Sequence, residues 1–220
     1  MPNTAKIKHM FFSASPVSRG KIHKGGLLSM LPTSVRRGYA RAKARMLLKE
    51  LAIPGPPVPI EEILEQYKVL REYAFDLEAP TTVKFRGKYI IFIPPSGNEF
   101  RDRWSFAHEF AHIYLKHFEI YPVNRIVMGQ AIDLLGEKEL YILDRECDIF
   151  VSELLMPKEW MYNAIDSPVL NMREVGELKD LFQVSWEAML NRLDELKIAV
   201  DGRTKRHVGS AENERADRKV

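Results

Sequence analysis

Two histidines and a glutamate stand in the segment His108-Glu109-Phe110-Ala111-His112, which matches the pattern H-E-x-x-H. In a helix, residues four apart lie one above the other, so both imidazoles can reach one zinc ion. Glu109 lies one position round the helix, where its carboxylate can act as general base on a water molecule that the metal activates. The motif therefore predicts metal-assisted hydrolysis at a carbonyl carbon.

A pair of buried histidines held by backbone carbonyls is the competing interpretation. It would also bury Glu109 without a cation, and an unpaired buried carboxylate costs several kcal/mol. Chance produces the pattern in about one chain in seventy of this composition. We therefore favour a metal site.

The two histidines leave the metal site incomplete, because a catalytic zinc ion usually has three protein ligands and an open position. The third histidine of the metzincins would require Gly at 115 and His at 118, whereas the chain has Leu115 and Phe118. His117 follows His112 by five residues, about 140° further round a continuous helix. We therefore expect His117 to point away, at the surface or the helix end.

Carboxylates on the next predicted helix, residues 137–156, are the other candidates for the third ligand. Glu146 and Glu153 both lie beside apolar positions of that helix, and their spacing does not distinguish them. Asp144 and Asp148 are expected on a wetter side. The competing interpretation of either glutamate is an ion pair with a neighbouring basic residue, or a charge on the helix surface.

The motif lies within a predicted helix over residues 99–118. Apolar side chains cover this helix on nearly all sides, which is typical of a helix at the centre of a domain. Two strands, 81–85 and 89–93, are predicted before it, joined by a hairpin loop at Arg86-Gly87-Lys88, and another strand is predicted within 68–73. We expect an edge of this hairpin to hold an extended substrate.

Helices account for most of the remaining structure. Apolar residues at three- and four-residue spacing predict helices over residues 35–52, 60–67, 137–156, 173–182 and 185–196. The segment 119–136 is expected to be irregular. These elements predict an α+β, zincin-like fold, in which a helical bundle surrounds the H-E-x-x-H helix beside a small three-stranded antiparallel or mixed sheet.

Composition excludes several classes of protein. A single cysteine, Cys147, excludes an internal disulfide framework and a cysteine-rich zinc ribbon. Cys147 lies on the apolar stripe of its helix, so we interpret it as a packing residue rather than a nucleophile. No apolar run reaches the ~18–20 residues that would span a bilayer.

Two stretches of the chain resemble the ImmA/IrrE family of zinc metallopeptidases. The first is Arg103-Trp104-Ser105-Phe106-Ala107, followed directly by the H-E-x-x-H motif. The second opens at Glu146 and closes with Leu154-Leu155-Met156-Pro157. A proline-rich segment at 56–63 is also similar, so that the resemblance covers residues 36–197.

The resemblance implies a ligand set and a cofactor. Glu146 is the implied third zinc ligand beside His108 and His112, and Glu109 is the implied catalytic residue. Zn²⁺ is the expected metal, although Mn²⁺ or Fe²⁺ would accept the same ligands. The group that lines the site and stabilises the transition state is left open among Tyr114, His117 and Tyr121.

The resemblance also implies a cytoplasmic endopeptidase whose substrate is a specific regulatory protein, typically a helix-turn-helix repressor or an antitoxin-like protein. The alternative is a non-catalytic, zinc-containing regulator that acts by binding protein or DNA. Residues 171–198 resemble the family's helix-turn-helix-like C-terminal segment. They carry six acidic and four basic residues, which argues against direct DNA binding. The oligomeric state is left open.

Charge divides the chain into parts. The formal net charge of +3 hides eleven basic residues and no acid in positions 1–49, and an acidic body with 16 basic and 26 acidic residues over 50–200. We predict a basic, disordered arm, a metallopeptidase domain, a helical segment packed on it and a disordered tail, at residues 1–34, 35–170, 171–198 and 199–220. Organellar targeting, or a translation start at Met30 or Met46, are alternatives for the arm.

Overall fold

The computed structural model describes residues 32–121, 123–129 and 136–202, which belong to a compact unit that begins at Pro32. Most of the predicted basic arm and of the predicted tail lies outside the described residues. The predicted boundaries of those two parts therefore stay predictions.

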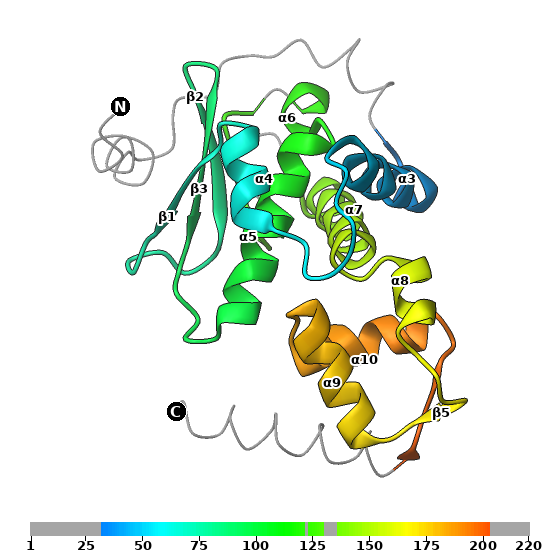
Figure 1. Ribbon diagram of the computed structural model, residues 1–220. Helices are drawn as coiled ribbons and strands as arrows, with labels where there is room; N and C mark the ends of the chain where they lie inside the picture. Colours follow the sequence, from blue (N-terminus) through cyan, green and yellow to red (C-terminus); the bar gives the residue numbers. More distant parts are fainter. Residues whose placement is uncertain (1–31, 122, 130–135, 203–220) are drawn as a thin grey trace. The chain divides into compact units, whose positions relative to one another are not determined.

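A four-stranded mixed sheet lies on one side of the described unit (Figure 1). Its strands are β1 (Leu70–Tyr73), β2 (Thr81–Phe85), β3 (Lys88–Ile93) and β4 (Arg125–Val127), in the order β1-β3-β2-β4. β2 and β3 form the predicted antiparallel hairpin, and β1 runs parallel to β3. Positive φ angles at Arg86 and Gly87 make the tight turn that joins β2 to β3.

The prediction of three strands was wrong because β4 lies in the segment that we expected to be irregular. β4 has only three residues and pairs with β2 in antiparallel register, with Ile126 opposite Thr82. A strand this short has no recognisable alternation in the sequence, and it exists because β2 offers it a backbone to pair with.

The central helix α5 (Glu99–Tyr114) carries the H-E-x-x-H motif and begins at the predicted position, after the N-cap residue Asn98. The Asn98 side chain accepts hydrogen bonds from the backbone N–H groups of Phe100 and Arg101, which caps the helix. α5 packs between the sheet and α7 (Glu137–Leu155), as Figure 1 shows. This position explains why the helix is apolar on nearly all sides.

The predicted helix 99–118 is two helices in the structure. Lys116 adopts a left-handed conformation with φ of 66°, and the short helix α6 (His117–Ile120) starts after it in a new direction. The change of direction at Lys116 alters where His117 points.

The other predicted helices are confirmed as α3 (Arg37–Glu50), α4 (Ile60–Gln66), α7, α9 (Met172–Phe182) and α10 (Trp186–Glu195). α3 packs against α7. The sequence did not predict α8 (Lys158–Asn163), nor the two-stranded parallel sheet of β5 (Val169–Leu170) and β6 (Ala199–Val200). The fold is therefore α+β.

A buried ion-pair network explains one of the two candidate glutamates. Glu153 on α7 accepts hydrogen bonds from Arg45 Nε at 2.7 Å and from an Arg192 terminal nitrogen at 2.5 Å. Arg192, itself buried, also donates to the backbone oxygen of Met156. Glu153 thus joins α3, α7 and α10. Glu153 therefore forms an ion pair, as the competing interpretation proposed. Its partners are arginines of other helices rather than basic residues close to it in sequence.

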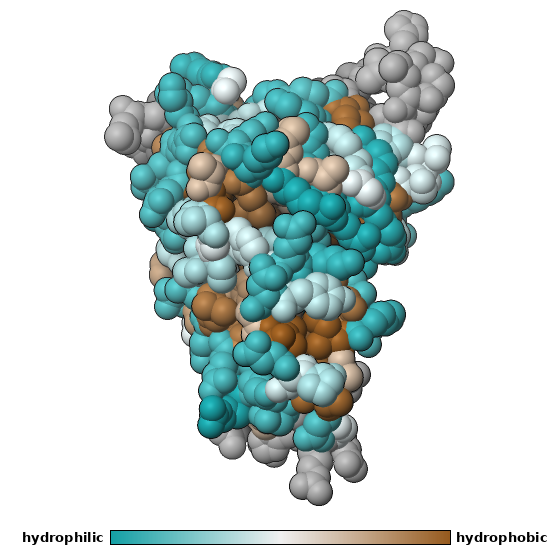
Figure 2. All heavy atoms as spheres, turned by 45° about the vertical axis from the view of Figure 1, so that its right-hand side comes forward, coloured by the Kyte–Doolittle hydropathy of each residue, from teal (hydrophilic) through white to brown (hydrophobic). Residues whose placement is uncertain are grey.

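Within the described part of the chain, we find no helix that is both long and apolar enough to cross a bilayer. On the face drawn in Figure 2, hydrophilic side chains cover most of the surface and apolar patches interrupt them.

Candidate metal centre

The motif residues His108, Glu109 and His112 face α7 and the sheet from the middle of α5, and each is at most 1 % exposed. In the described residues, all but one of the buried side-chain polar atoms without a hydrogen-bond partner belong to these three residues and Asp144. Buried polar atoms without a partner are rare and costly, so several in one place fit a binding site for a cation or a water molecule.

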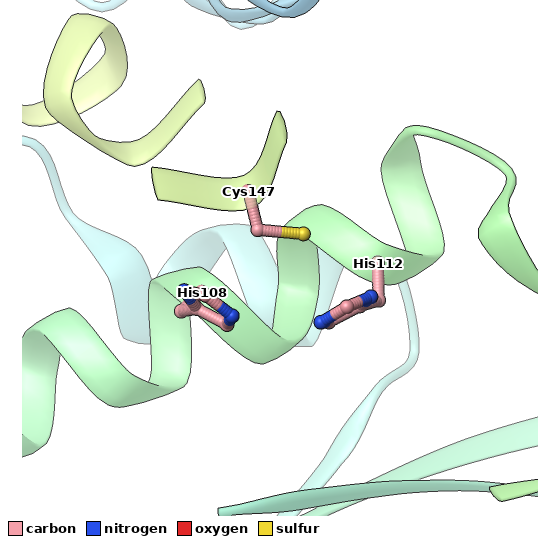
Figure 3. Close-up of side chains that lie close together, drawn as sticks. All are labelled: His108, His112 and Cys147. Carbon is pink, nitrogen blue, oxygen red and sulfur yellow. The ribbon is translucent and has the colours of Figure 1, made fainter. Parts of the chain in front are cut away.

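A sulfur atom completes a cluster with the two histidines. One ring nitrogen each of His108 and His112, and Sγ of Cys147, all lie within 4.8 Å of one another. Figure 3 shows Cys147 extending from α7 towards the two rings on α5. These three buried side chains could hold a metal ion, and nitrogen with sulfur is a donor set that zinc accepts.

Asp144 presents an oxygen to the same two rings. Its Oδ1 atom lies 3.9 Å from His108 Nε2 and 3.6 Å from His112 Nε2. Ligand atoms that share one tetrahedral zinc ion stand roughly 3.3 Å apart, so a small inward shift would complete a His, His and Asp site. The other oxygen, Oδ2, accepts a hydrogen bond from the backbone N–H of Gly129, which turns Oδ1 towards the rings.

Glu146, the implied third ligand, contacts different groups. Its carboxylate accepts hydrogen bonds from the backbone N–H, Nε and a terminal nitrogen of Arg36, at 2.7–2.8 Å. It also lies 3.2 Å from His117 Nε2. Residues two apart on a helix point about 200° apart, so Glu146 and Asp144 cannot both face α5 in the same way. These contacts favour Asp144 as the metal ligand.

Both motif histidines have another side chain close to Nδ1 and present Nε2 towards Asp144. His108 Nδ1 lies 3.2 Å from Asp148 Oδ1, within ion-pair range although without hydrogen-bond geometry. His112 Nδ1 lies 3.0 Å from His117 Nδ1. If His112 Nδ1 donates to His117 Nδ1, then His117 Nε2 donates to Glu146, and each of these three ring nitrogens has a hydrogen-bond partner. This pattern is typical of metal-binding histidines.

His117 is buried, so the expectation of a surface position was wrong. The expectation assumed a continuous helix, whereas Lys116 redirects the chain and turns His117 back towards His112. Tyr121 is also buried, with an unpartnered hydroxyl. The Tyr114 hydroxyl donates to Glu50 on α3, and the structure does not bring it to the histidines.

Glu109 lies beside the sheet, with one carboxylate oxygen held and the other unpartnered. Thr82 Oγ1 on β2 donates to Glu109 Oε2 at 2.6 Å. Burial raises the pKa of Glu109 to about 7, although the nearby charge of His108 and the Thr82 hydrogen bond both oppose this shift. A carboxylate with a pKa near neutrality can take up and release a proton during turnover.

The metal-free site carries its positive charge on one histidine. Burial lowers the pKa of His108, but contacts with Asp144 and Asp148 outweigh it and raise that pKa to about 10. Burial, with repulsion from His117 and His108, lowers the pKa of His112 well below its usual value. Burial would raise the pKa of Glu146, but hydrogen bonds from Arg36 and His117 lower it to about 2.

Stability of the metal-free protein should therefore depend on pH through opposing contributions. The raised pKa of Glu109 contributes stability at low pH that is lost as the pH rises from 4.5 to about 7, and that of His108 is lost from 6.5 to about 10. The lowered pKa of Glu146 contributes stability that is lost as the pH falls from 4.5 to about 2, and the lowered pKa of His112 contributes stability that is lost as the pH falls below 6.5.

We expect the difference in stability between wild type and Glu109→Gln to change between pH 5 and 7, as measured by thermal unfolding of the chelated proteins in a pH series. The variant lacks the contribution of Glu109, on the order of 3 kcal/mol, that the wild type loses over this range, so its Tm should rise relative to that of the wild type. A Tm difference that stays constant from pH 5 to 7 would contradict the raised pKa of Glu109.

Comparison with known proteins identifies the family. Residues 64–194, more than half of the chain, match the peptidase M78 family, described as the IrrE N-terminal-like domain. The matched range contains the H-E-x-x-H helix, the whole of α7 and most of α10. The comparison with curated proteins gave no match. The chain therefore belongs to the ImmA/IrrE family of metallopeptidases.

Proposed function

We propose that this protein is a zinc-dependent endopeptidase whose metal is held by His108, His112 and Asp144. The observation that carries the proposal is the convergence of both Nε2 atoms and Asp144 Oδ1 in a buried site where none of them has a hydrogen-bond partner. Glu146 stays a prediction as the third ligand, and its contacts support an outer role instead. The zincin-like architecture is proposed on the same grounds.

When bound, the metal supplies Lewis acidity, which makes water a stronger acid and a peptide carbonyl a better electrophile. Glu109 performs the proton transfers. Thr82 holds one oxygen of its carboxylate, and the free oxygen accepts a proton from the attacking water. The same group then returns the proton to the leaving amine. Tyr121, with its unpartnered hydroxyl, is the proposed donor to the oxyanion.

The substrate strand is proposed to pair with β4 rather than with the hairpin. Both hairpin strands already have a neighbour on each side, whereas β4 has one neighbour in the described part of the sheet. β4 lies beside the site, since it pairs with Thr82 and is followed by Gly129, which holds Asp144. An extended peptide added to this edge would pass the metal.

A specific regulatory protein is the proposed substrate, with a helix-turn-helix repressor or antitoxin-like protein as the class, in the cytoplasm. The family gives the class of reaction, which is hydrolysis of a peptide bond, and so implies a protein substrate. Direct DNA binding by α9 and α10 is not proposed. Arg192 of α10 pairs with Glu153, and Arg103 of α5 donates to the backbone oxygens of Phe182 and Gln183, so this helix pair packs on the peptidase core.

Removing the metal is expected to abolish cleavage and to lower the Tm. The test uses the purified protein with candidate helix-turn-helix regulators from the same genome, and mass spectrometry of the products. At a zinc concentration about 100 times its Kd, binding stabilises the fold by ~2.7 kcal/mol, which is several degrees in Tm. Added Zn²⁺ should restore both readouts, and Mg²⁺ serves as the control cation.

Cleavage that persists after complete removal of the metal would contradict the proposal. Zinc binding without cleavage of any candidate regulator would favour the alternative, a zinc-containing regulator that acts by binding.

A further inference from the structure

A pocket of about 200 Å³ lies where α8, β5 and α9 meet, and Figure 1 shows these elements next to one another. Five of the residues that line it are apolar, including Leu170, Leu178 and Leu181, and three are acidic, Asp166, Glu174 and Glu177. None of the lining residues is basic, and none belongs to the metal centre. The pocket is therefore a separate feature of the fold that the proposed mechanism does not use.

Apolar side chains form both the inner wall and part of the rim of the pocket. Leu170 on β5 and Leu178 on α9 are buried, whereas Leu181 is 44 % exposed and the neighbouring Val169 is 51 % exposed. Leu181 follows Leu178 by three residues, so both lie on one side of α9. A single exposed leucine needs no explanation, but one beside a hollow with an apolar lining offers an incoming apolar side chain a place to be buried.

The acidic residues give the same pocket a negative charge at neutral pH. Glu174 accepts hydrogen bonds from the backbone N–H of Asn171 and from Ser167, which lower the pKa of its carboxyl group. Glu177 pairs only with Arg173, one turn away on α9, and both side chains are well exposed at 61 % and 85 %. An exposed pair of this kind contributes little, so Glu177 can exchange its partner for another cation.

Size and charge exclude several kinds of ligand. Pockets for small molecules and cofactors usually measure ~300–1,000 Å³, so this one suits a single side chain. Carboxylates repel nucleic acid and anionic lipid, and a second copy of the same surface would bring like charges together. In the part of the chain that the structure describes, metal-ligand spacing occurs only at His108, His112 and Cys147. A peptide that carries a cation beside an apolar side chain complements both parts of the pocket.

We propose that this pocket docks a basic segment of a partner protein, in which one apolar side chain is flanked by lysine or arginine. The apolar side chain enters between β5 and α9, and the flanking cations lie against the exposed carboxylates of Glu177 and Asp166. The inference goes beyond the proposed peptidase activity and does not depend on it. A partner held here is bound whether or not it is also a substrate.

An NMR titration with a synthetic peptide tests the docking. The probe is a short peptide with one leucine that has lysines on both sides, added to isotope-labelled full-length protein at physiological salt. We expect it to shift the amide signals of Leu170, Glu177 and Leu181 and to leave those of α5 unchanged. Serine in place of the leucine of the probe should lower its affinity by about 10–100-fold, because burial of a leucine side chain accounts for that factor.

Two variants of the protein have matched controls at exposed positions. Glu177→Lys should weaken binding of the probe by about 5-fold and reduce its dependence on salt, whereas Glu65→Lys, the same change on α4, should not. Leu181→Ser should weaken binding by about 10-fold, because it removes an apolar side chain from the rim. Phe75→Ser, at an 85 % exposed position between β1 and β2, is its control, and circular dichroism checks that all four variants fold.

Several outcomes would overturn the inference. A probe that shifts no signal at the pocket, or that binds as tightly when serine replaces its leucine, would show that no apolar side chain docks there. The same holds if the control variants weaken binding as much as Glu177→Lys and Leu181→Ser do. A dimer that Leu181→Ser dissociates would make a second copy the occupant, and a probe that binds only after removal of residues 203–220 would make that segment the occupant. None of these results bears on the metal site, which zinc content and cleavage test separately.

Discussion

Glu109→Gln is expected to lower the rate of peptide cleavage by about 10²–10⁴-fold while the protein keeps its metal. Glutamine has nearly the same shape as glutamate but cannot accept a proton at the unpartnered oxygen. Its side-chain oxygen can still accept the hydrogen bond from Thr82, so the local structure should survive. The measurement is cleavage of the regulator that the wild type cleaves, together with the zinc content of the purified variant.

Glu62→Gln is the matched control, because it makes the same chemical change at an exposed position on α4. It should leave both cleavage and zinc content unchanged. If Glu109→Gln cleaved the substrate as fast as wild type does, Glu109 would not be the base, and the proposed mechanism would be abandoned.

Asp144→Asn is expected to remove most of the zinc, whereas Glu146→Gln should retain it with weaker affinity. Asparagine lacks the charged oxygen that Asp144 presents 3.6 Å and 3.9 Å from the two Nε2 atoms. Glu146 reaches the site only through His117 and His112. Its loss should therefore cost the ~10–100-fold in affinity that is typical of an outer partner.

Competition with a zinc-binding dye measures both affinities, and circular dichroism checks that each variant folds. Asp166→Asn, at an exposed position, is the control for the aspartate change. The opposite ranking, with Glu146→Gln losing the zinc and Asp144→Asn retaining it, would restore Glu146 as the third ligand.

The H-E-x-x-H motif could be recognised and placed without the structure, because its logic is local. Four-residue spacing on a helix brings His108 and His112 to one face whatever surrounds them. The apolar cover of the helix likewise predicted that α5 would be buried, as the structure shows. The family resemblance rested on this stretch together with the segment from Glu146 to Pro157, and the match over residues 64–194 confirms it.

The sequence could not predict in this way which carboxylate would be the third metal ligand. Asp144, Glu146 and Glu153 share one helix, and periodicity placed the two glutamates beside apolar positions but Asp144 on a wetter side. Which one meets α5 depends on the rotation of α7 about its axis, and contacts with α3, α5 and α10 set that rotation. Arginines distant in sequence, Arg36 and Arg192, each engage one of the glutamates.

The sequence by itself determined the H-E-x-x-H helix, the place of Glu109 on it and the α+β class, because each depends on spacing within a few residues. Only the tertiary structure decided the position of His117, the fourth strand and the approach of Asp144 and Cys147 to the histidines. Those features depend on a left-handed residue at Lys116 and on the packing of α7 against α5. Side chains far apart in the chain meet only where the packed elements bring them together, and no local pattern records that.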